Sequence, residues 1–231
     1  MLLISLAGVA SAATIVQTQN FAFVPNGSQA LTFNRFDDNQ GTLISVTVSV
    51  TLNKTGGSYE IDNDSATSGT IDLTHNVIGQ LSSTDVSLRK SGAGVVFVGQ
   101  NGSLTATNTL SNQSVSATTG DSTTTFNATG LADYVLFTPT DSTKTDSGTI
   151  RSADQADYES TGASTFNINM GGTQTVNATG LGGLQQAFTV SSISGDVVVT
   201  YNYTAFAPVP EPASALLGGI GLLGLLRRRR R

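Results

Sequence analysis

Residues 44–52 read ISVTVSVTL, a stretch in which apolar and hydroxyl-bearing side chains alternate without interruption. Successive side chains of a β-strand point to opposite faces, so the pattern places Ile, Val and Leu on one face and Ser and Thr on the other. The β-branched residues that fill most of the stretch favour extended backbone. The stretch therefore predicts a strand with one face in a core and the other in water.

The same period of two returns elsewhere in the chain. Within residues 197–203, one face of the predicted strand is formed by Val197, Val199, Tyr201 and Tyr203. Shorter alternating runs are separated by glycine-rich turn signals. These signals include Gly56-Gly57, Gly171-Gly172 and Gly182-Gly183.

Helix signals are scarce, and the one candidate in the body is the short charged segment 152–160. Many short strands with polar outer faces predict an all-β fold, an antiparallel β-sandwich or jelly roll. We expect residues 13–207 to form it as a single domain. A short hydrophobic helix is expected near the C-terminus, over residues 213–226.

The distribution of charge separates the body from the end of the chain. The chain has 231 residues, of which 12% are charged and none is cysteine. From Ala13 to Val209 there are six basic and fifteen acidic residues, a net charge of −9, whereas the last five residues are all arginine. An acidic body repels nucleic acid and anionic lipid, so nucleic acid is not an expected partner. The lack of cysteine excludes disulfides and thiolate metal sites.

The N-terminus has the features of a leader for export. Residues 1–13 read MLLISLAGVASAA, an apolar run followed by Ala10-Ser11-Ala12, a small-x-small cleavage site. We expect a signal peptide over residues 1–12, cleaved after Ala12. No Lys or Arg precedes the apolar run, which suggests that the recorded start lies downstream of the true one. The alternative is an ordinary buried strand at this end.

The C-terminus, residues 208–231, has three parts in a fixed order. A proline-flanked acid at 209–212 comes first, then fourteen apolar or small residues at 213–226, then an arginine cluster at 227–231. As a helix, the apolar part spans about 21 Å, shorter than the roughly 30 Å hydrocarbon core of a bilayer. This length favours a transient crossing over a permanent anchor, with the arginines on the cytoplasmic side. A plain tail-anchored helix is the alternative.

This order of parts resembles the PEP-CTERM sorting signal of Gram-negative bacteria. The resemblance implies export, a transient stay in the inner membrane, processing by an exosortase-type transpeptidase, and release to the cell surface or the extracellular space. It also implies that the processing enzyme recognises the first part of the tail. The sorting residues are Val209, Pro210, Glu211 and Pro212, and the stop and orientation residues are Arg227, Arg228, Arg229, Arg230 and Arg231.

The body resembles the bacterial choice-of-anchor E domain. The resemblance is carried by residues 33–37 (FNRFD), by Gly41-Thr42-Leu43 leading into the alternating strand, and by residues 195–203 directly before the tail. It covers residues 13–207. The resemblance implies a location outside the cytoplasm and no particular chemistry.

Residues suited to catalysis are few. His75 is the only histidine, and alternation places it on the apolar face with Ile71 and Leu73, so a buried structural role is favoured over a Ser-His-Asp triad. Glycoside hydrolysis needs two carboxylates facing each other across a substrate, but the body has only Glu60 and Glu159 besides aspartates in turn-like contexts. We therefore expect no enzymatic activity and no catalytic residues.

A calcium site is the one cofactor hypothesis that the residues suggest. Residues 60–64 read EIDND and put three acids and an amide within five positions. Alternate oxygen ligands on an extended segment suit a hard cation, with Asp62 and Asp64 as candidate ligands. A solvated hairpin turn explains the same residues, and no other cofactor is expected.

Three functions follow from these observations. The leading hypothesis is an exported, non-enzymatic surface or matrix protein associated with exopolysaccharide. The alternative is a secreted glycan-binding module, with or without calcium, and the third is a glycosidase-like enzyme.

Overall fold

The computed structural model describes residues 11–92, 104–117 and 132–206, so residues 1–10 of the predicted leader and the whole tail lie outside the described residues. Antiparallel strands dominate these residues, which confirms the all-β prediction. In chain order the elements are β1 (Ala12–Phe23), β2 (Gly27–Asn34), β3 (Phe36–Asp37), η1 (Asp38–Gln40), β4 (Gly41–Thr55), β5 (Ser58–Asn63), β6 (Gly69–Ser82), β7 (Leu104–Val115), β8 (Tyr134–Phe137), β9 (Ser142–Thr149), η2 (Ser152–Tyr158), β10 (Glu159–Ser160), β11 (Thr165–Thr179), β12 (Leu184–Thr189) and β13 (Ser192–Ala205).

The strands form three main sheets. Sheet I has the order β1-β13-β4-β9, sheet II has the order β2-β11-β6-β7, and sheet III has the order β12-β5-β8. A separate two-residue parallel pairing joins β3 to β10. The chain passes directly between sheets I and III at two points, because β4 leads into β5 and β12 leads into β13. Sheet II lies against both of them.

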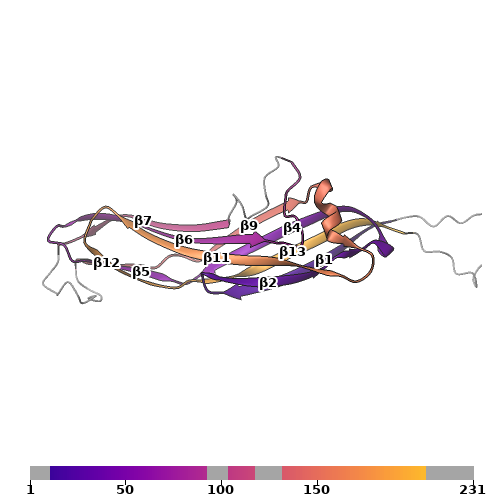
Figure 1. Cartoon of the computed structure of the whole chain (residues 1–231). Helices are drawn as coiled ribbons and strands as arrows, with labels where there is room; N and C mark the ends of the chain where they lie inside the picture. The colour runs from indigo at the N-terminus through magenta and orange to yellow at the C-terminus, as the bar shows by residue number, and fades with distance from the viewer. Residues whose placement is uncertain (1–10, 93–103, 118–131, 207–231) are drawn as a thin grey trace, which may run out of the picture.

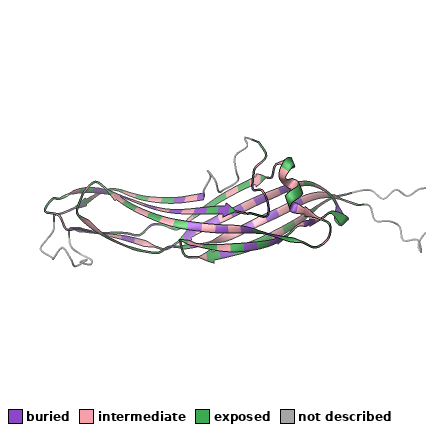
Figure 2. Ribbon diagram, viewed as in Figure 1, coloured by how far each residue is buried: buried purple, intermediate pink, exposed green. Residues whose placement is uncertain are grey.

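The two alternating stretches of the sequence are direct neighbours in sheet I. β4 contains the first and β13 the second, and they pair antiparallel with Val48 opposite Val199 and Val50 opposite Val197. These four valines are at most 1% exposed. Figure 2 shows the resulting alternation of buried and more exposed residues along the strands. The predicted half-buried strands are therefore confirmed, and their apolar faces adjoin one another.

Ile44 is the exception, because it is 56% exposed although the pattern placed it in the core. The pairing of β4 with β13 shifts register at this point: Ser45 lies opposite Asn202, but Leu43 lies opposite Tyr203. Ile44 is the extra residue of this bulge and has no partner in the register. A bulge reverses which side chains face inward, so Leu43 packs against the core in its place.

Gly171-Gly172 is not a turn, contrary to the sequence-based prediction. Both residues lie inside β11, which pairs there with β2 on one side and β6 on the other. A Cβ atom on Gly172 would lie 2.5 Å from the Ile193 side chain of sheet I. The glycine is therefore required because the two sheets approach closely, and not because the chain reverses.

The buried side chains form two hydrophobic cores. The larger core lies between sheets I and II and contains Phe33, Leu52 and Met170, while the smaller one lies between sheets II and III and contains Tyr59, Ile61 and Leu73. β6 and β11 contribute to both cores because each is long enough to pass from one to the other.

Figure 1 shows an elongated body with β5 and β12 toward one end and the start of β1 at the other. Of the predicted helical segment 152–160, residues Ser152–Tyr158 form the 3₁₀ helix η2 near the larger core, where Tyr158 is buried, and Glu159–Ser160 is the strand β10. Within the described residues, neither helix has the length or the apolar character needed to cross a lipid bilayer. The predicted hydrophobic helix 213–226 lies outside the described residues.

Candidate functional site

The two chain ends that carry the predicted processing signals emerge side by side. Ala12 of β1 lies opposite Thr204 of β13. The Ser11 carbonyl accepts a hydrogen bond from the Ala205 N–H at 2.9 Å, and the Gln40 carbonyl accepts one from the Phe206 N–H at 3.2 Å. The sorting residues 209–212 and the arginines 227–231 lie outside the described residues, but only two residues separate Phe206 from Val209.

The candidate calcium ligands occupy unlike environments. Asp62 is in the middle strand of sheet III, only 1% exposed, and lies opposite Tyr134 of β8 and Gln185 of β12. Asp64 follows the end of that strand. No group of three or more His, Cys, Asp or Glu side chains able to hold a metal ion occurs within residues 11–92, 104–117 and 132–206. Calcium binding by these two aspartates stays a prediction.

His75 lies on β6 where the two cores meet and is completely buried. Its Nε2 atom is 3.3 Å from the Ser191 hydroxyl, which donates a hydrogen bond to the Gly56 carbonyl. Nδ1 has no hydrogen-bond partner among the described residues. Burial, reinforced by the positive charge of Lys54, lowers the pKa of His75 from 6.5 to about 4, so the ring is neutral at pH 7. Placement on the apolar face, as the alternation predicted, is confirmed.

Lys54 is a further buried polar group at this junction, and it continues the inward-facing row of β4 after Leu52. The side chain is completely buried, and Nζ lies 2.9 Å from the Thr140 carbonyl, 3.3 Å from the Pro139 carbonyl and 3.4 Å from the Asn108 side-chain oxygen. Burial lowers the pKa of Lys54, and the charge of Asp141 partly opposes this effect. The junction between the cores is therefore a polar layer.

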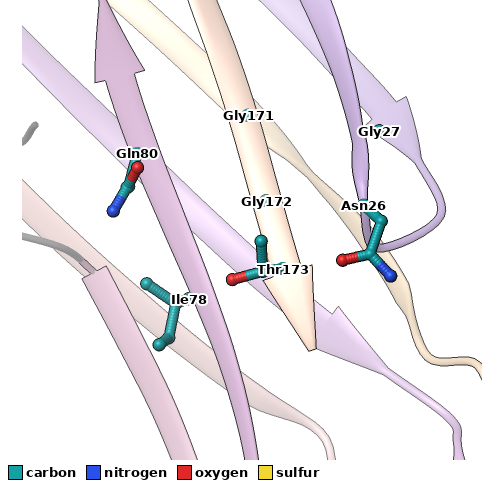
Figure 3. A pocket seen from close by; sticks show the side chains of 7 residues that line it. All are labelled: Asn26, Gly27, Ile78, Gln80, Gly171, Gly172 and Thr173. Carbon is teal, nitrogen blue, oxygen red and sulfur yellow. The ribbon is translucent and has the colours of Figure 1, made fainter. Parts of the chain in front are cut away.

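A groove of about 220 Å³ lies over β6, β11 and the turn before β2. Figure 3 shows Ile78 and Gln80 on β6, Thr173 on β11, and Asn26 at the turn, around the backbone of Gly171. A Cβ atom on Gly171 would meet nothing closer than the Ser28 Cβ atom at 3.9 Å. The groove thus exists because a glycine interrupts the row of side chains on the outer face of sheet II.

The groove lining contains no charged side chain. Its polar groups are the amides of Asn26 and Gln80 and the hydroxyl of Thr173, beside the apolar side chain of Ile78. Amides and hydroxyls both donate and accept hydrogen bonds, and they suit a neutral ligand rich in hydroxyl groups. This groove, which we call the Gly171 groove, is the candidate ligand site of the body.

Sequence reasoning did not identify the Gly171 groove or the buried Lys54. The signal for Lys54 was the alternation itself, because residue 54 is the next even position after Leu52. The signal for the groove was a glycine pair flanked by alternating residues, which also occurs at turns.

Comparison with known proteins identifies a sorting signal at the C-terminal end of the chain, of the kind carried by a class of exported proteins. Residues 208–231 match the PEP-CTERM protein-sorting motif. The motif indicates an exported protein that is targeted to an exosortase. The match includes the predicted sorting residues and arginines and does not extend into the β body. A search of curated proteins found no match.

Solved structures give only weak likenesses. The VP2 subviral particle of infectious bursal disease virus aligns over 83% of this chain and 38% of the viral chain, at 9% identity and a TM-score of 0.21. The Gx strain of the same virus aligns over 89% and 42%, at 12% identity and a TM-score of 0.17. The present chain thus spans well under half of the viral chains, and likenesses at these TM-scores carry no argument about function.

Proposed function

We propose that this is a non-enzymatic protein of the cell surface or extracellular matrix, processed at its tail by an exosortase and associated with exopolysaccharide. The sorting motif at residues 208–231 carries the proposal. The apolar part of the tail halts in the inner membrane only transiently, with Arg227 to Arg231 on the cytoplasmic side. As part of this proposal, residues 13–207 form a domain similar to the choice-of-anchor E domain.

The position of the chain ends supports this route. Because Ala12 pairs with Thr204, the leader and the tail leave the folded body at the same end. The predicted N-terminal cut site and the sorting tail therefore face the same membrane during export. After both cleavages, the end that contains sheet III is the one farthest from the attachment point (Figure 1).

The outer faces of the sheets support an association with uncharged polymer. On sheet II, Thr74 lies between Asn177 and Thr109 in one row across the strands. On sheet I, Thr47 lies between Thr200 and Thr149 in a comparable row. Hydroxyl and amide groups at strand spacing present repeated donors and acceptors without charge, which suits contact with a neutral polysaccharide.

The Gly171 groove favours the second candidate function, a glycan-binding module. In this version the body itself binds sugar at Gln80 and Thr173, and the calcium-dependent form would use Asp62 and Asp64. The glycosidase-like alternative would require two carboxylates facing each other, and the groove lining contains none. We therefore place binding, and not hydrolysis, at this site.

Replacing Pro210, Glu211 and Pro212 with Ala in a host that carries an exosortase tests the sorting step. The intact mass of the protein in envelope and medium fractions is the measurement. We expect the variant to retain the tail in the envelope, whereas the unaltered chain loses it. A control with Ala at the exposed positions Thr18, Asn20 and Thr145 should be processed normally. Normal loss of the tail from the first variant would overturn the proposal.

A further inference from the structure

We propose that the end of the body from which the tail emerges docks onto the processing enzyme through a shallow pocket beside Phe206. This docking rests on the proposed function, because it needs an exosortase-type enzyme that binds the tail. The pocket has a volume of about 500 Å³. We call it the proximal pocket, and its lining includes Asp38, Leu43, Glu159, Thr161 and Phe206.

The short connection between the body and the sorting residues brings the enzyme against this pocket. Val209 is the third residue after Phe206, and an extended chain spans at most about 3.6 Å per residue, so the two lie within about 11 Å of each other. A single helix with its side chains is already about 10–12 Å thick. An enzyme whose cleft encloses residues 209–212 therefore has its wall in contact with the end of the body.

The proximal pocket is formed by three parts of the chain that hydrogen bonds hold together. These parts are residues 38–43, residues 159–161 and Phe206. The Thr161 hydroxyl donates a hydrogen bond to the Asp38 carboxylate at 2.9 Å and joins the first two parts. The Phe206 N–H donates to the Gln40 carbonyl at 3.2 Å and joins the third part to the first. The pocket is therefore a surface of the folded body and is absent from the unfolded chain.

The side chains of the proximal pocket define the enzyme surface that fits it. Asp38 and Glu159 contribute two carboxylates, and within the described part of the chain the lining includes no basic side chain. Phe206 is 59% exposed, so a large apolar side chain borders the two acids. The matching enzyme surface presents Lys or Arg beside an apolar side chain. Carboxylates repel anionic lipid, so these residues favour the enzyme over the membrane surface as the partner.

The rate of tail loss from the full chain, in a host that carries an exosortase, tests the docking. The test variant combines Asp38→Lys with Glu159→Lys, and intact mass over a time course after synthesis reports the rate. We expect about tenfold slower tail loss than in the native chain, because like charges then face each other across the interface. The control combines Glu60→Lys with Asp196→Lys, changes the net charge equally outside the pocket lining, and should lose the tail at the native rate.

A spacer variant separates docking from steric obstruction by the body. It carries a flexible Gly-Ser insertion of about six residues between Phe206 and Ala207 and keeps every residue of the pocket. Docking predicts slower tail loss, because a longer linker lowers the effective concentration of the sorting residues at the cleft of the docked enzyme. Obstruction predicts faster loss. Equal or faster tail loss in the spacer variant would overturn the docking, and this result does not depend on the folding of the charge-reversed variant.

Two further outcomes distinguish the docking from the sorting route. Tail loss at the native rate in the charge-reversed variant would refute the docking, and faster loss would indicate attraction of this end to anionic lipid and refute it as well. The sorting route fails separately, if the chain with Ala at Pro210, Glu211 and Pro212 still loses its tail normally. The docking alone fails if that chain keeps its tail while the charge-reversed and spacer variants are processed like the native chain.

Discussion

Ala12 of β1 lies directly opposite Thr204 of β13, and the next pair is Ala13 with Tyr203. The predicted signal-peptidase bond, between Ala12 and Ala13, is therefore inside a strand pair once the body has folded. A peptidase must bind its scissile segment as an accessible extended chain, and here β13 occupies that segment. The predicted N-terminal cut therefore requires that cleavage precede the pairing of β13.

The order of cleavage and folding can be measured directly. We expect purified, folded full-length chain to resist a signal peptidase in detergent, whereas a peptide of residues 1–20 is cut after Ala12. The reason is that β13 covers Ala12 and Ala13 only in the folded body. N-terminal sequencing of the products reports the site. Equal cleavage rates for the folded chain and the peptide would contradict the prediction.

Filling the Gly171 groove should abolish binding without harming the fold. In Gly171→Thr, the new side chain occupies the groove, and a β-branched residue in a strand interior stabilises it by roughly 0.5–1 kcal/mol relative to glycine. We expect loss of co-sedimentation with the host exopolysaccharide and an unchanged or higher melting temperature. The control is Ser49→Thr on the outer face of sheet I. Undiminished co-sedimentation of Gly171→Thr would remove the groove as the ligand site.

Gly195 should tolerate no side chain. Its φ is +155°, and a Cβ atom there would lie 1.9 Å from the Thr51 carbonyl oxygen of the neighbouring strand. We expect Gly195→Ala to lower the free energy of unfolding by about 3 kcal/mol or more, measured by chemical denaturation. Gly182→Ala is the matched control, because nothing lies within 4 Å of its added Cβ, and it should be close to neutral. Equal stability of the two variants would show that β4 and β13 are not paired as described.

His75 makes stability depend on pH below neutrality. Its pKa is lowered from 6.5 to about 4 in the folded state, so between these values the unfolded chain binds more protons. The stabilisation is therefore complete above pH 6.5 and is lost as the pH falls toward 4, by about 3 kcal/mol. Denaturation at several pH values measures this loss.

The variant His75→Gln supplies the comparison for the pH profile. Glutamine can keep a polar contact with Ser191 but does not titrate, so the carboxylates alone shape its profile. We expect the native chain to lose more stability than His75→Gln between pH 6.5 and 4. Parallel profiles would mean that the ring is not neutral and buried at this position.

The alternation of side chains was enough to predict the strands and their inner faces, because burial of one face of a sheet imposes a period of two. Alternation did not predict the face of a side chain where pairing with another strand determines that face. Ile44 faces outward because of a bulge opposite Asn202 and Tyr203, and nothing local to Ile44 encodes it. Residue 172 must be glycine because a side chain there would collide with Ile193, which belongs to another sheet.

The candidate sites divide in the same way. The sorting tail was readable because its three parts are contiguous in sequence, and the motif match confirms it. The contact between Lys54 and Asn108 joins residues of two different sheets. The Gly171 groove needs the turn at Asn26 to be brought beside β11, where the Asn26 N–H donates to the Gly172 carbonyl. Such contacts between residues far apart in the sequence depend on the topology of the sheets, which a single sequence does not reveal.

The continuous run of β13 along sheet I bears on how the protein withstands mechanical load. A chain tethered beyond Phe206 and dragged from the opposite end, as in flowing liquid, is pulled lengthwise along β13. Its hydrogen bonds with β1 and β4 are then loaded in shear, and many of them carry the force at the same time. Pulling the two termini apart would instead separate β1 from β13 one hydrogen bond at a time. Attachment through the C-terminus alone thus loads the body in its tougher direction.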